Sequence, residues 1–423
     1  MIAELCDRLK IGGRVREAAL EANDRIAGFA YDTQQHVQLK VLEAFFAEGI
    51  AESDLAGTTG YGYDDAARAR YESLLARILG TERAIARLSI VSGTHAIVAA
   101  LAACTPRAAT LLSISGAPYD TLRNAICDAP YSLTNEGIRY REVALDGGGA
   151  IDLAAVAKEL AAGEVATVFI QRSRGYAPRR SLTVAECDAA AAAVKRLAPN
   201  VAVLVDNCYG ELVEEREPAQ ADLMMGSLIK NLGGSIAPAG AYVAGRAELI
   251  ERVAARLYAP GLGAALGPTL GFGRAFFQGL FLAPLVVEQT LRGLDFTAAL
   301  FEALGYSVEP AAGAHRTDIV QAIRLGSPEA IACFTEALQA AMPVNARFRP
   351  EPGAVPGYRD PVLMSSGAFV GGATIELSCD APLRPPYEVY VQGGVVAAHA
   401  YTGSLLAASA LESSRGPSRP KKP

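Results

Sequence analysis

The sequence predicts an α/β protein with a parallel sheet and a smaller C-terminal domain. From about residue 88, short apolar runs alternate with Ala-rich stretches of helical character. The runs at residues 109–115, 165–171 and 201–207 are continuous and bounded, as is typical of parallel strands covered on both faces. Between the last two runs, residues 182–197 predict a crossover helix that opens at Ser181 or Thr183.

Residues 1–50 precede the strands and predict two amphipathic helices. Apolar side chains recur there at helical spacing, at Val41, Leu42, Phe45 and Phe46. A loop rich in Gly, Thr and Tyr follows at residues 57–65. The next predicted helix carries Leu74, Leu75, Ile78 and Leu79.

The 423 residues suffice for a large core and a smaller domain. Beyond about residue 285, helical stretches give way to mixed elements. We therefore expect an N-terminal helical segment at 1–56, a large domain at 57–285 and a small C-terminal domain at 286–412. The tail at 413–423 has no apolar anchors and predicts disorder.

Composition narrows the class of protein. Hydrophobic residues make up 51% and charged residues 20%, which indicates a globular chain. A net charge of −6 argues against a nucleic-acid partner. Seven cysteines without CxxC pairs and four histidines predict no metal site and a reduced cytosol. The start does not resemble a signal peptide, and no apolar run reaches the roughly 18 residues of a membrane span. We expect a cytoplasmic protein without a membrane partner.

Asp206 and Lys230 are the most informative pair in the chain. Asp206 ends the apolar run at 201–207, and Lys230 follows a segment of small and hydroxyl residues about two dozen positions later. This arrangement is typical of a pyridoxal 5′-phosphate site. The carboxylate keeps the pyridine nitrogen protonated, and the lysine amine bonds to the aldehyde as a Schiff base. A single lysine after a loop is otherwise usually solvent-facing.

A phosphate site is predicted at the segment SGTHAI, residues 92–97. It places Ser92, Gly93 and Thr94 at the start of an Ala-rich helix, where backbone N–H groups and the helix dipole favour an anion. Ordinary N-capping by Ser92 or Thr94 is the alternative. Ser227 precedes Lys230 and can add a hydroxyl to the same phosphate.

Tyr119 lies just past the predicted strand at 109–115, at the edge where ligands bind in open α/β folds. Its ring can stack on the cofactor, and its hydroxyl can protonate a leaving group. A half-buried loop tyrosine is the alternative reading.

Several longer motifs resemble one family. They include TGYGYDD at 59–65, IQRSRGY at 170–176, VDNCYGE at 205–211, SLIKNLGG at 227–234 and the run at 369–387. Together they resemble the aluminium-resistance or methionine γ-lyase-like branch of the Cys/Met-metabolism pyridoxal phosphate enzymes, over roughly residues 25–395. The resemblance implies fold type I, with a seven-stranded large domain and a small α+β C-terminal domain. It also implies a homo-oligomer, a dimer or tetramer, with active sites shared between subunits.

The resemblance also implies residue roles. Lys230 is the Schiff-base lysine, Asp206 the pyridine-nitrogen partner and Tyr119 the stacking ring. Ser92, Gly93, Thr94 and Ser227 hold the phosphate. Tyr61 reaches the neighbouring subunit's cofactor, and Tyr63 on the same segment contacts substrate.

The chain departs from the better-known lyases in two places. Ile229 replaces a threonine that contacts the phosphate, and Glu376 replaces the arginine that grips the substrate carboxylate. Candidate replacements are Arg384, Arg172 and Arg174, because a guanidinium binds a carboxylate through two hydrogen bonds. For each of the three, a structural ion pair is the alternative.

The expected function is γ- or β-elimination of a thiol or other leaving group from an amino acid by a carbon–heteroatom lyase of amino-acid metabolism. Other pyridoxal phosphate chemistry on the same fold is the alternative. That class includes loss of a halide or phosphate, γ-replacement and amino transfer. A non-enzymatic role is a third reading.

Overall fold

The computed structural model describes residues 1–415. The chain divides into two compact units, one formed by residues 32–285 and the other by residues 1–31 together with the chain from residue 286 on. The predicted N-terminal segment is therefore split between the units. Of the predicted tail, Ser413 and Ser414 end a helix, and residues 416–423 lie outside the described part of the chain.

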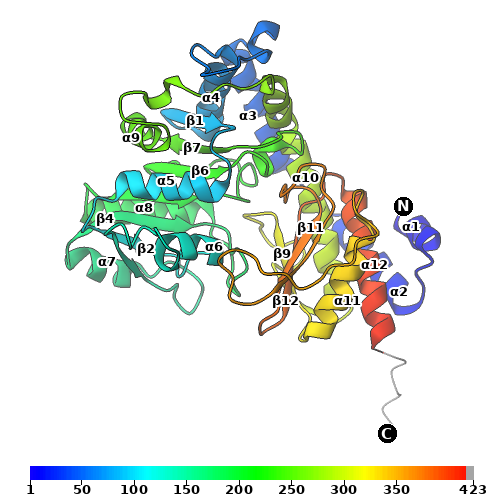
Figure 1. Cartoon of the computed structure of the whole chain (residues 1–423). Helices are drawn as coiled ribbons and strands as arrows, with labels where there is room; N and C mark the ends of the chain where they lie inside the picture. The colour runs from blue at the N-terminus through cyan, green and yellow to red at the C-terminus, as the bar shows by residue number, and fades with distance from the viewer. Residues whose placement is uncertain (416–423) are drawn as a thin grey trace. The chain divides into compact units, whose positions relative to one another are not determined.

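A seven-stranded sheet forms the centre of the 32–285 unit (Figure 1). Its spatial order is β1-β7-β6-β5-β4-β2-β3. The strands are β1 (Arg83–Arg87), β2 (Thr110–Ser113), β3 (Arg139–Glu142), β4 (Val165–Gln171), β5 (Ala202–Asp206), β6 (Leu223–Ser227) and β7 (Ala241–Gly245). Strands β6, β5, β4, β2 and β3 are parallel, and β7 is antiparallel to both of its neighbours. The predicted fold class is confirmed, and the three predicted strands are β2, β4 and β5.

Helices cover both faces of this sheet. Helices α5 (Gly93–Cys104) and α9 (Ala247–Leu257) share one apolar cluster with the strands, and α7 (Leu153–Ala161) and α8 (Val184–Leu197) share the other. Along β4, Phe169 faces the first cluster, whereas Val168 and Ile170 face the second. This alternation is the period of two expected of a strand that is buried on both sides. Thr183 caps α8 through a capping box with Glu186, which decides between the two predicted helix starts.

The N-terminal region contains three helices where two were predicted. They are α1 (Ile2–Leu9), α2 (Gly13–Ile26) and α3 (Asp32–Glu48). Lys10 ends α1 in the left-handed conformation, so the chain turns before α2. On α3, Val41 is buried but Phe46 is 76% exposed, so the predicted apolar face was too wide. The predicted leucine-rich helix is α4 (Ala66–Leu79), and Leu74, Leu75, Ile78 and Leu79 are all buried.

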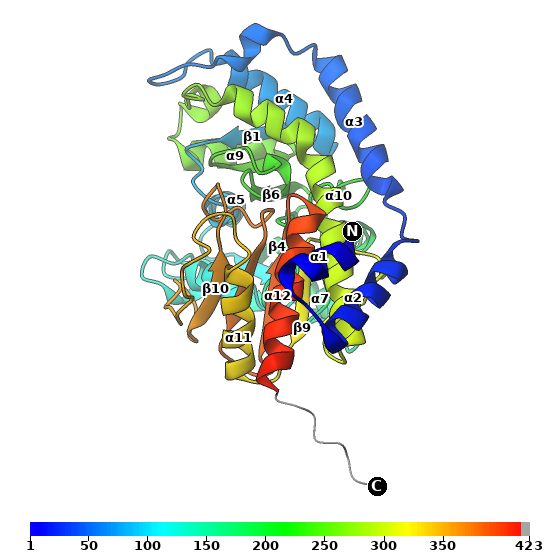
Figure 2. The same cartoon turned by 90° about the vertical axis from the view of Figure 1, so that its right-hand side faces the viewer.

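The second unit is built on a five-stranded antiparallel sheet in the order β10-β11-β12-β9-β8. The strands are β8 (Ser307–Glu309), β9 (Val320–Arg324), β10 (Val362–Ser366), β11 (Ser378–Pro382) and β12 (Glu388–Gln392). Helices α11 (Pro328–Gln339) and α12 (Ala397–Ser414) lie side by side, with α1 and α2 against α12 (Figure 2). Helix α10 (Gly273–Ala303) crosses the boundary at residue 285. Within residues 1–415, no helix has the length and apolarity that a membrane span requires.

Candidate active site

Asp206 is the last residue of β5 and lies at the carboxyl edge of the parallel strands. It is 4% exposed, and its Oδ1 accepts a hydrogen bond from the Cys208 N–H at 3.1 Å. Burial raises the pKa of Asp206, while the Cys208 donors and the positive charges of Lys230 and Arg179 act against that increase. A buried carboxylate at this edge is what the pyridine nitrogen of the predicted site requires.

Lys230 follows β6 in a turn, and the structure places its amine against an aromatic ring. The Nζ atom lies 3.7 Å from the centroid of the Tyr209 ring. Burial lowers the pKa of Lys230, but Tyr209, Cys208 and Asp206 together outweigh that effect, and the pKa is raised. The lysine is therefore a partly buried group held by neighbours and not a solvent-facing side chain.

The start of α5 meets the same strand edge. A Cβ atom on Gly93 would lie 3.1 Å from the Cys208 Sγ and 3.6 Å from the Ser227 Cβ. The glycine therefore brings the helix N-terminus close to both the β5 loop and the end of β6. Ser92 accepts a hydrogen bond from the His95 N–H at 3.1 Å, so its hydroxyl caps the helix. Its predicted phosphate contact stays a prediction.

Tyr119 joins this cluster through two hydrogen bonds. Its hydroxyl lies 2.7 Å from the Thr94 Oγ1, and its backbone N–H donates to the Gln171 Oε1 at 2.8 Å. Burial raises the pKa of Tyr119 well above its ordinary value, and the charge of Asp206 raises it further. The phenol is thus held in its protonated form, which is the form that can donate a proton.

Gln171 was not singled out from the sequence, although a signal for it exists. It ends β4 and pairs in register with Asp206 across the parallel ladder. Ends of neighbouring parallel strands meet at one edge, so the two predicted strands could have placed these residues together.

The three candidate arginines have different surroundings. Arg172 is fully buried, with Nη2 at 2.6 Å from the Glu214 Oε2 and Nη1 at 2.7 Å from the Asn207 Oδ1. Its contacts favour the structural ion pair that was the alternative reading. Arg174 is also buried, and its Nε donates to the Ala177 carbonyl at 3.2 Å.

Arg384 belongs to the other unit and is more accessible. Its side chain is 33% exposed, and Nη1 lies 3.6 Å from the Asp360 Oδ2. A guanidinium that is partly exposed can still reach a ligand. No described contact tests which arginine binds substrate, so all three roles stay predictions.

Replacing Arg172 by methionine should strongly destabilise the protein. The change would leave the buried Glu217 and the partly buried Glu214 beside an apolar side chain, and breaking a buried pair typically costs about 3–5 kcal/mol. Urea unfolding of Arg172→Met measures the loss. Arg8→Met, which removes an exposed partner of Glu4, is the control and should change little. Equal stability of the two variants would contradict this view of Arg172.

Tyr61 and Tyr63 lie on the loop before α4 and are 76% and 54% exposed. Their rings contact each other, with centroids 6.1 Å apart. Arg68 donates to the carbonyls of Gly62, between the two tyrosines, and of Gly267, the latter at 2.8 Å. These bonds fix the loop that carries the two rings. The two rings are available to another molecule, and their action in a neighbouring subunit stays a prediction.

Glu376, which the resemblance places where better-known lyases have an arginine, stabilises a loop of its own unit. It is 4% exposed, and its two carboxylate oxygens accept the N–H groups of Phe369 at 2.8 Å and Val370 at 3.1 Å. A carboxylate engaged by two backbone donors ties down this loop.

The family model for methionine gamma-lyase matches residues 15–412. The uncharacterized protein YnbB of Bacillus subtilis is 40% identical over 414 residues, which cover 96% of this chain and 98% of YnbB. The chain belongs to the methionine γ-lyase family.

Solved structures agree with this assignment. A carbon-sulfur lyase involved in aluminum resistance from Clostridium novyi NT is 37% identical, with a TM-score of 0.91 over 96% of this chain and 98% of that one. The pyridoxal-5′-phosphate dependent protein YhfS of Escherichia coli is 18% identical, with a TM-score of 0.60 over 89% and 96% of the two chains, and shows the shared fold alone. The predicted family and fold type I are both confirmed.

Pyridoxal 5′-phosphate is the cofactor of the methionine γ-lyase family, so the cofactor prediction is confirmed at that level. The residues of this chain fit the cofactor. A buried carboxylate at Asp206 suits the ring nitrogen, and the amine of Lys230, which follows the neighbouring strand β6, suits the aldehyde. The first turn of α5 and the Ser227 hydroxyl, brought together at Gly93, suit the phosphate.

Glu211 is a buried carboxyl group near this site, and its raised pKa predicts that the free energy of unfolding depends on pH. Its Oε1 accepts from the Tyr242 hydroxyl at 3.0 Å, and burial together with the charge of Glu217 raises its pKa to about 8. In the unfolded chain the same carboxyl ionises near its ordinary value of 4.5. Between pH 4.5 and about pH 8 the Glu211 carboxyl is protonated in the folded chain and ionised in the unfolded chain. Its contribution to the free energy of unfolding therefore falls as pH rises from about 4.5 to about 8.

The variant Glu211→Gln removes that titration. We expect its free energy of unfolding, relative to the wild type, to increase between pH 5 and pH 8 by on the order of a few kcal/mol. Urea unfolding across this pH range measures the difference. A difference that stays constant with pH would contradict a protonated Glu211 in the folded protein.

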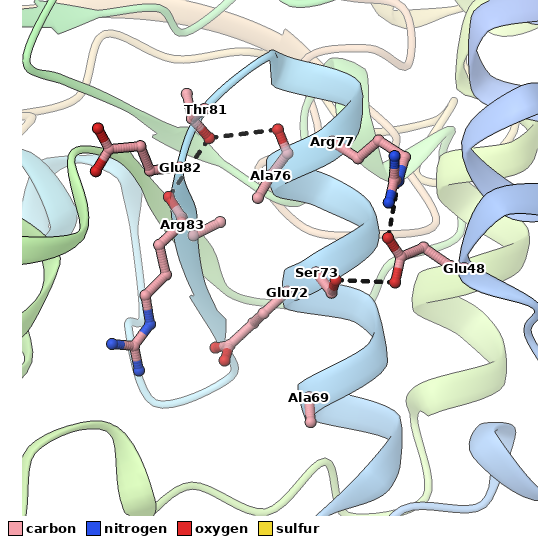
Figure 3. Close-up of a pocket in the computed structure, with 10 residues that line it drawn as sticks. Glu48, Ala69, Glu72, Ser73, Ala76, Arg77, Thr81, Glu82 and Arg83 are labelled. Atoms are coloured by element: carbon pink, nitrogen blue, oxygen red, sulfur yellow. Dashed lines mark hydrogen bonds and ion pairs between the residues drawn. The ribbon is translucent and has the colours of Figure 1, made fainter.

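A hollow of about 500 Å³ lies between α4 and β1, away from the strand edge (Figure 3). Its carboxylates are engaged. Glu48 accepts from Ser73 and Arg77, each at 2.8 Å, and Glu72 accepts from the Ala86 N–H at 2.9 Å. These contacts explain the lining of the hollow as structural, and the candidate active site remains at Asp206 and Lys230.

Proposed function

We propose that this member of the methionine γ-lyase family eliminates a thiol or other leaving group from the γ- or β-carbon of an amino acid. The observation that carries the proposal is that buried Asp206 ends β5 and Lys230 follows the neighbouring strand β6, at the strand edge where α5 begins. The cofactor, when bound, supplies an aldehyde for the amine and a ring that accepts electrons from the substrate's α-carbon. The leaving group departs with a proton, and water releases a 2-oxoacid and ammonia.

Lys230 is the group that moves protons in this proposal. Its amine must be neutral to remove the α-proton, and the ammonium that results can return the proton or release it. For γ-elimination the same nitrogen must also remove a β-proton. The side chain therefore has to stay close to the substrate between steps, because a positioned base is far more effective than one that must search for its proton.

Asp206 and Tyr119 have fixed tasks. Asp206 supplies a buried negative charge for the ring nitrogen, and the Cys208 N–H orients that carboxylate. Tyr119 stacks on the ring and donates its hydroxyl proton to a departing thiolate. Tyr119 is protonated at neutral pH, as a general acid must be before it donates.

The remaining predicted roles belong to the same proposal. Ser92, Gly93, Thr94 and Ser227 hold the phosphate. Arg384, the most accessible of the three candidate arginines, binds the substrate carboxylate. Tyr61 and Tyr63 act on a neighbouring subunit of a cytoplasmic homo-oligomer, and their exposure supports this assignment.

The test is a substrate panel with the holoenzyme. Cysteine, methionine, cystathionine, homoserine esters and γ-halo amino acids are each incubated with the protein, and 2-oxoacid and ammonia are measured. Equal amounts of the two products support elimination. Transfer of the amino group to an added oxoacid, without ammonia, would instead establish the aminotransferase alternative. Absence of any cofactor absorbance would remove the enzymatic reading altogether.

A further inference from the structure

The side chain of Tyr209 lies against the amine that the proposed reaction depends on. The Lys230 Nζ is 3.7 Å from the centroid of its ring, well within the roughly 6 Å over which an ammonium is attracted to an aromatic face. Tyr209 is in the loop that leaves β5 directly after Asp206. The roles assigned above do not include it.

The backbone at Tyr209 adopts an uncommon conformation. Its φ is +73°, in the left-handed region that a bulky side chain rarely enters. Such conformations persist where the surrounding structure enforces them, and they cluster at active sites. Here the enforcement comes from Asn231, whose Nδ2 donates to the carbonyls of Tyr209 at 3.0 Å and Glu211 at 2.8 Å. Because Asn231 directly follows Lys230, one side chain links the lysine turn to the tyrosine loop.

The loop that carries Tyr209 is also held by contacts with Asn207 and Arg172. The Gly210 N–H donates to the Asn207 carbonyl at 2.9 Å, and the Asn207 side chain accepts from the buried Arg172 at 2.7 Å. Gly210 packs directly against the Arg172 guanidinium, and a Cβ atom at position 210 would collide with that group. The position of Tyr209 is thus set by contacts on both sides, which indicates a placed ring and not an adaptable surface side chain.

We propose that Tyr209 is a catalytic residue whose ring holds the free Lys230 amine, in its ammonium form, between proton transfers. This inference rests on the function proposed above, in which Lys230 leaves the cofactor when substrate binds. An aromatic face attracts an ammonium much more strongly than a neutral amine. The contact therefore strengthens when Lys230 takes up the α-proton and weakens when the proton is passed on. No covalent bond to Tyr209 forms, and no electrons are exchanged.

The titratable groups that face Lys230 are Tyr209, Cys208 and Asp206. Of these, Asp206 is assigned to the ring nitrogen, and burial raises the pKa of the Cys208 thiol well above its ordinary value, so the thiol stays neutral. Tyr209 is consequently the residue left to retain the ammonium once the cofactor is bound, through its ring face and through its hydroxyl, which also raises the pKa of Lys230.

The test compares variants of the full-length protein at position 209. Tyr209→Phe keeps the ring, Tyr209→Leu removes it, and Tyr209→Asn removes it with a residue that tolerates the left-handed backbone. Tyr131→Leu is the matched control, because Tyr131 also has a positive φ, of 64°, but is 91% exposed. Thermal unfolding of each variant verifies that it is folded.

Two readouts are measured. The first is kcat on the best substrate of the panel, which should fall about tenfold in Tyr209→Leu and Tyr209→Asn and less in Tyr209→Phe. The second is the rate at which cofactor-free protein captures added pyridoxal phosphate, followed by absorbance against pH. Because only the neutral amine reacts, its pH midpoint reports the pKa of Lys230. That midpoint should move down by about one unit when the ring is lost and stay in place in Tyr131→Leu.

The outcomes separate the inference from the proposed function. If the wild type captures the cofactor and turns over substrate, but Tyr209→Leu and Tyr209→Asn match Tyr131→Leu in both readouts, the role of Tyr209 is refuted alone. If Tyr209→Phe loses as much as Tyr209→Leu, the hydroxyl and not the ring is responsible, which also overturns the proposal. If the wild type does not capture pyridoxal phosphate at Lys230, the proposed function itself fails.

Discussion

Replacing Lys230 by alanine should lower turnover by at least about 10⁴-fold. The variant loses both the amine that bonds to the cofactor aldehyde and the base that removes the α-proton. The absorbance of the bound cofactor should disappear from its usual position as well. Steady-state assays and absorbance spectra of the purified variant measure the two effects together.

Lys158→Ala is the control for this experiment. Lys158 lies on α7, is exposed, and has no part in the proposed site. Its replacement should leave spectrum and turnover unchanged. Turnover by Lys230→Ala near the wild-type rate would show that another group carries the chemistry.

Asp206→Asn should have the second largest effect. The amide keeps the shape of the carboxylate but removes the buried negative charge, so the ring nitrogen loses the anion that keeps it protonated. Removing one preorganised electrostatic group typically costs about 10²-fold to 10³-fold in kcat. We expect a fall of this size, with cofactor still attached to Lys230.

The control here is Asp24→Asn, a change at an exposed position on α2. It alters the net charge by the same amount and should leave kcat unchanged. If Asp206→Asn retained full kcat, the proposed role of Asp206 in drawing electrons into the ring would be wrong, even if Lys230 still bound the cofactor.

The sequence predicted the parts of the fold that depend on local pattern. The runs that became β2, β4 and β5 are apolar because helices cover both faces of the sheet, and that requirement is visible in the residues themselves. The crossover helix α8 was predicted from its strongly helical stretch, and the capping box of Thr183 with Glu186 is a local signal that could have fixed its start. The number of N-terminal helices was wrong, although the break carried a local signal, because Gly12 and Gly13 follow the left-handed Lys10 that ends α1.

Contacts across the strand edge were harder to predict. Gln171 reaches Tyr119, and Asn231 reaches Tyr209, through side chains far apart in sequence. The ring of Tyr209 meets Lys230 only because the loop adopts a positive φ that tyrosine does not favour. Residue type alone gives no sign of such a conformation. The pairing of Arg172 with Glu214 and Glu217 likewise depends on how the loop after β5 folds back.

The most direct test of the central claim is to locate the cofactor bond. The holoenzyme is reduced with borohydride, which makes the bond between cofactor and lysine permanent, and the digested protein is mapped by mass spectrometry. The account predicts a pyridoxyl group on the peptide that contains Lys230 and on no other. A label on a different lysine, or no label on a protein that still turns over substrate, would contradict it.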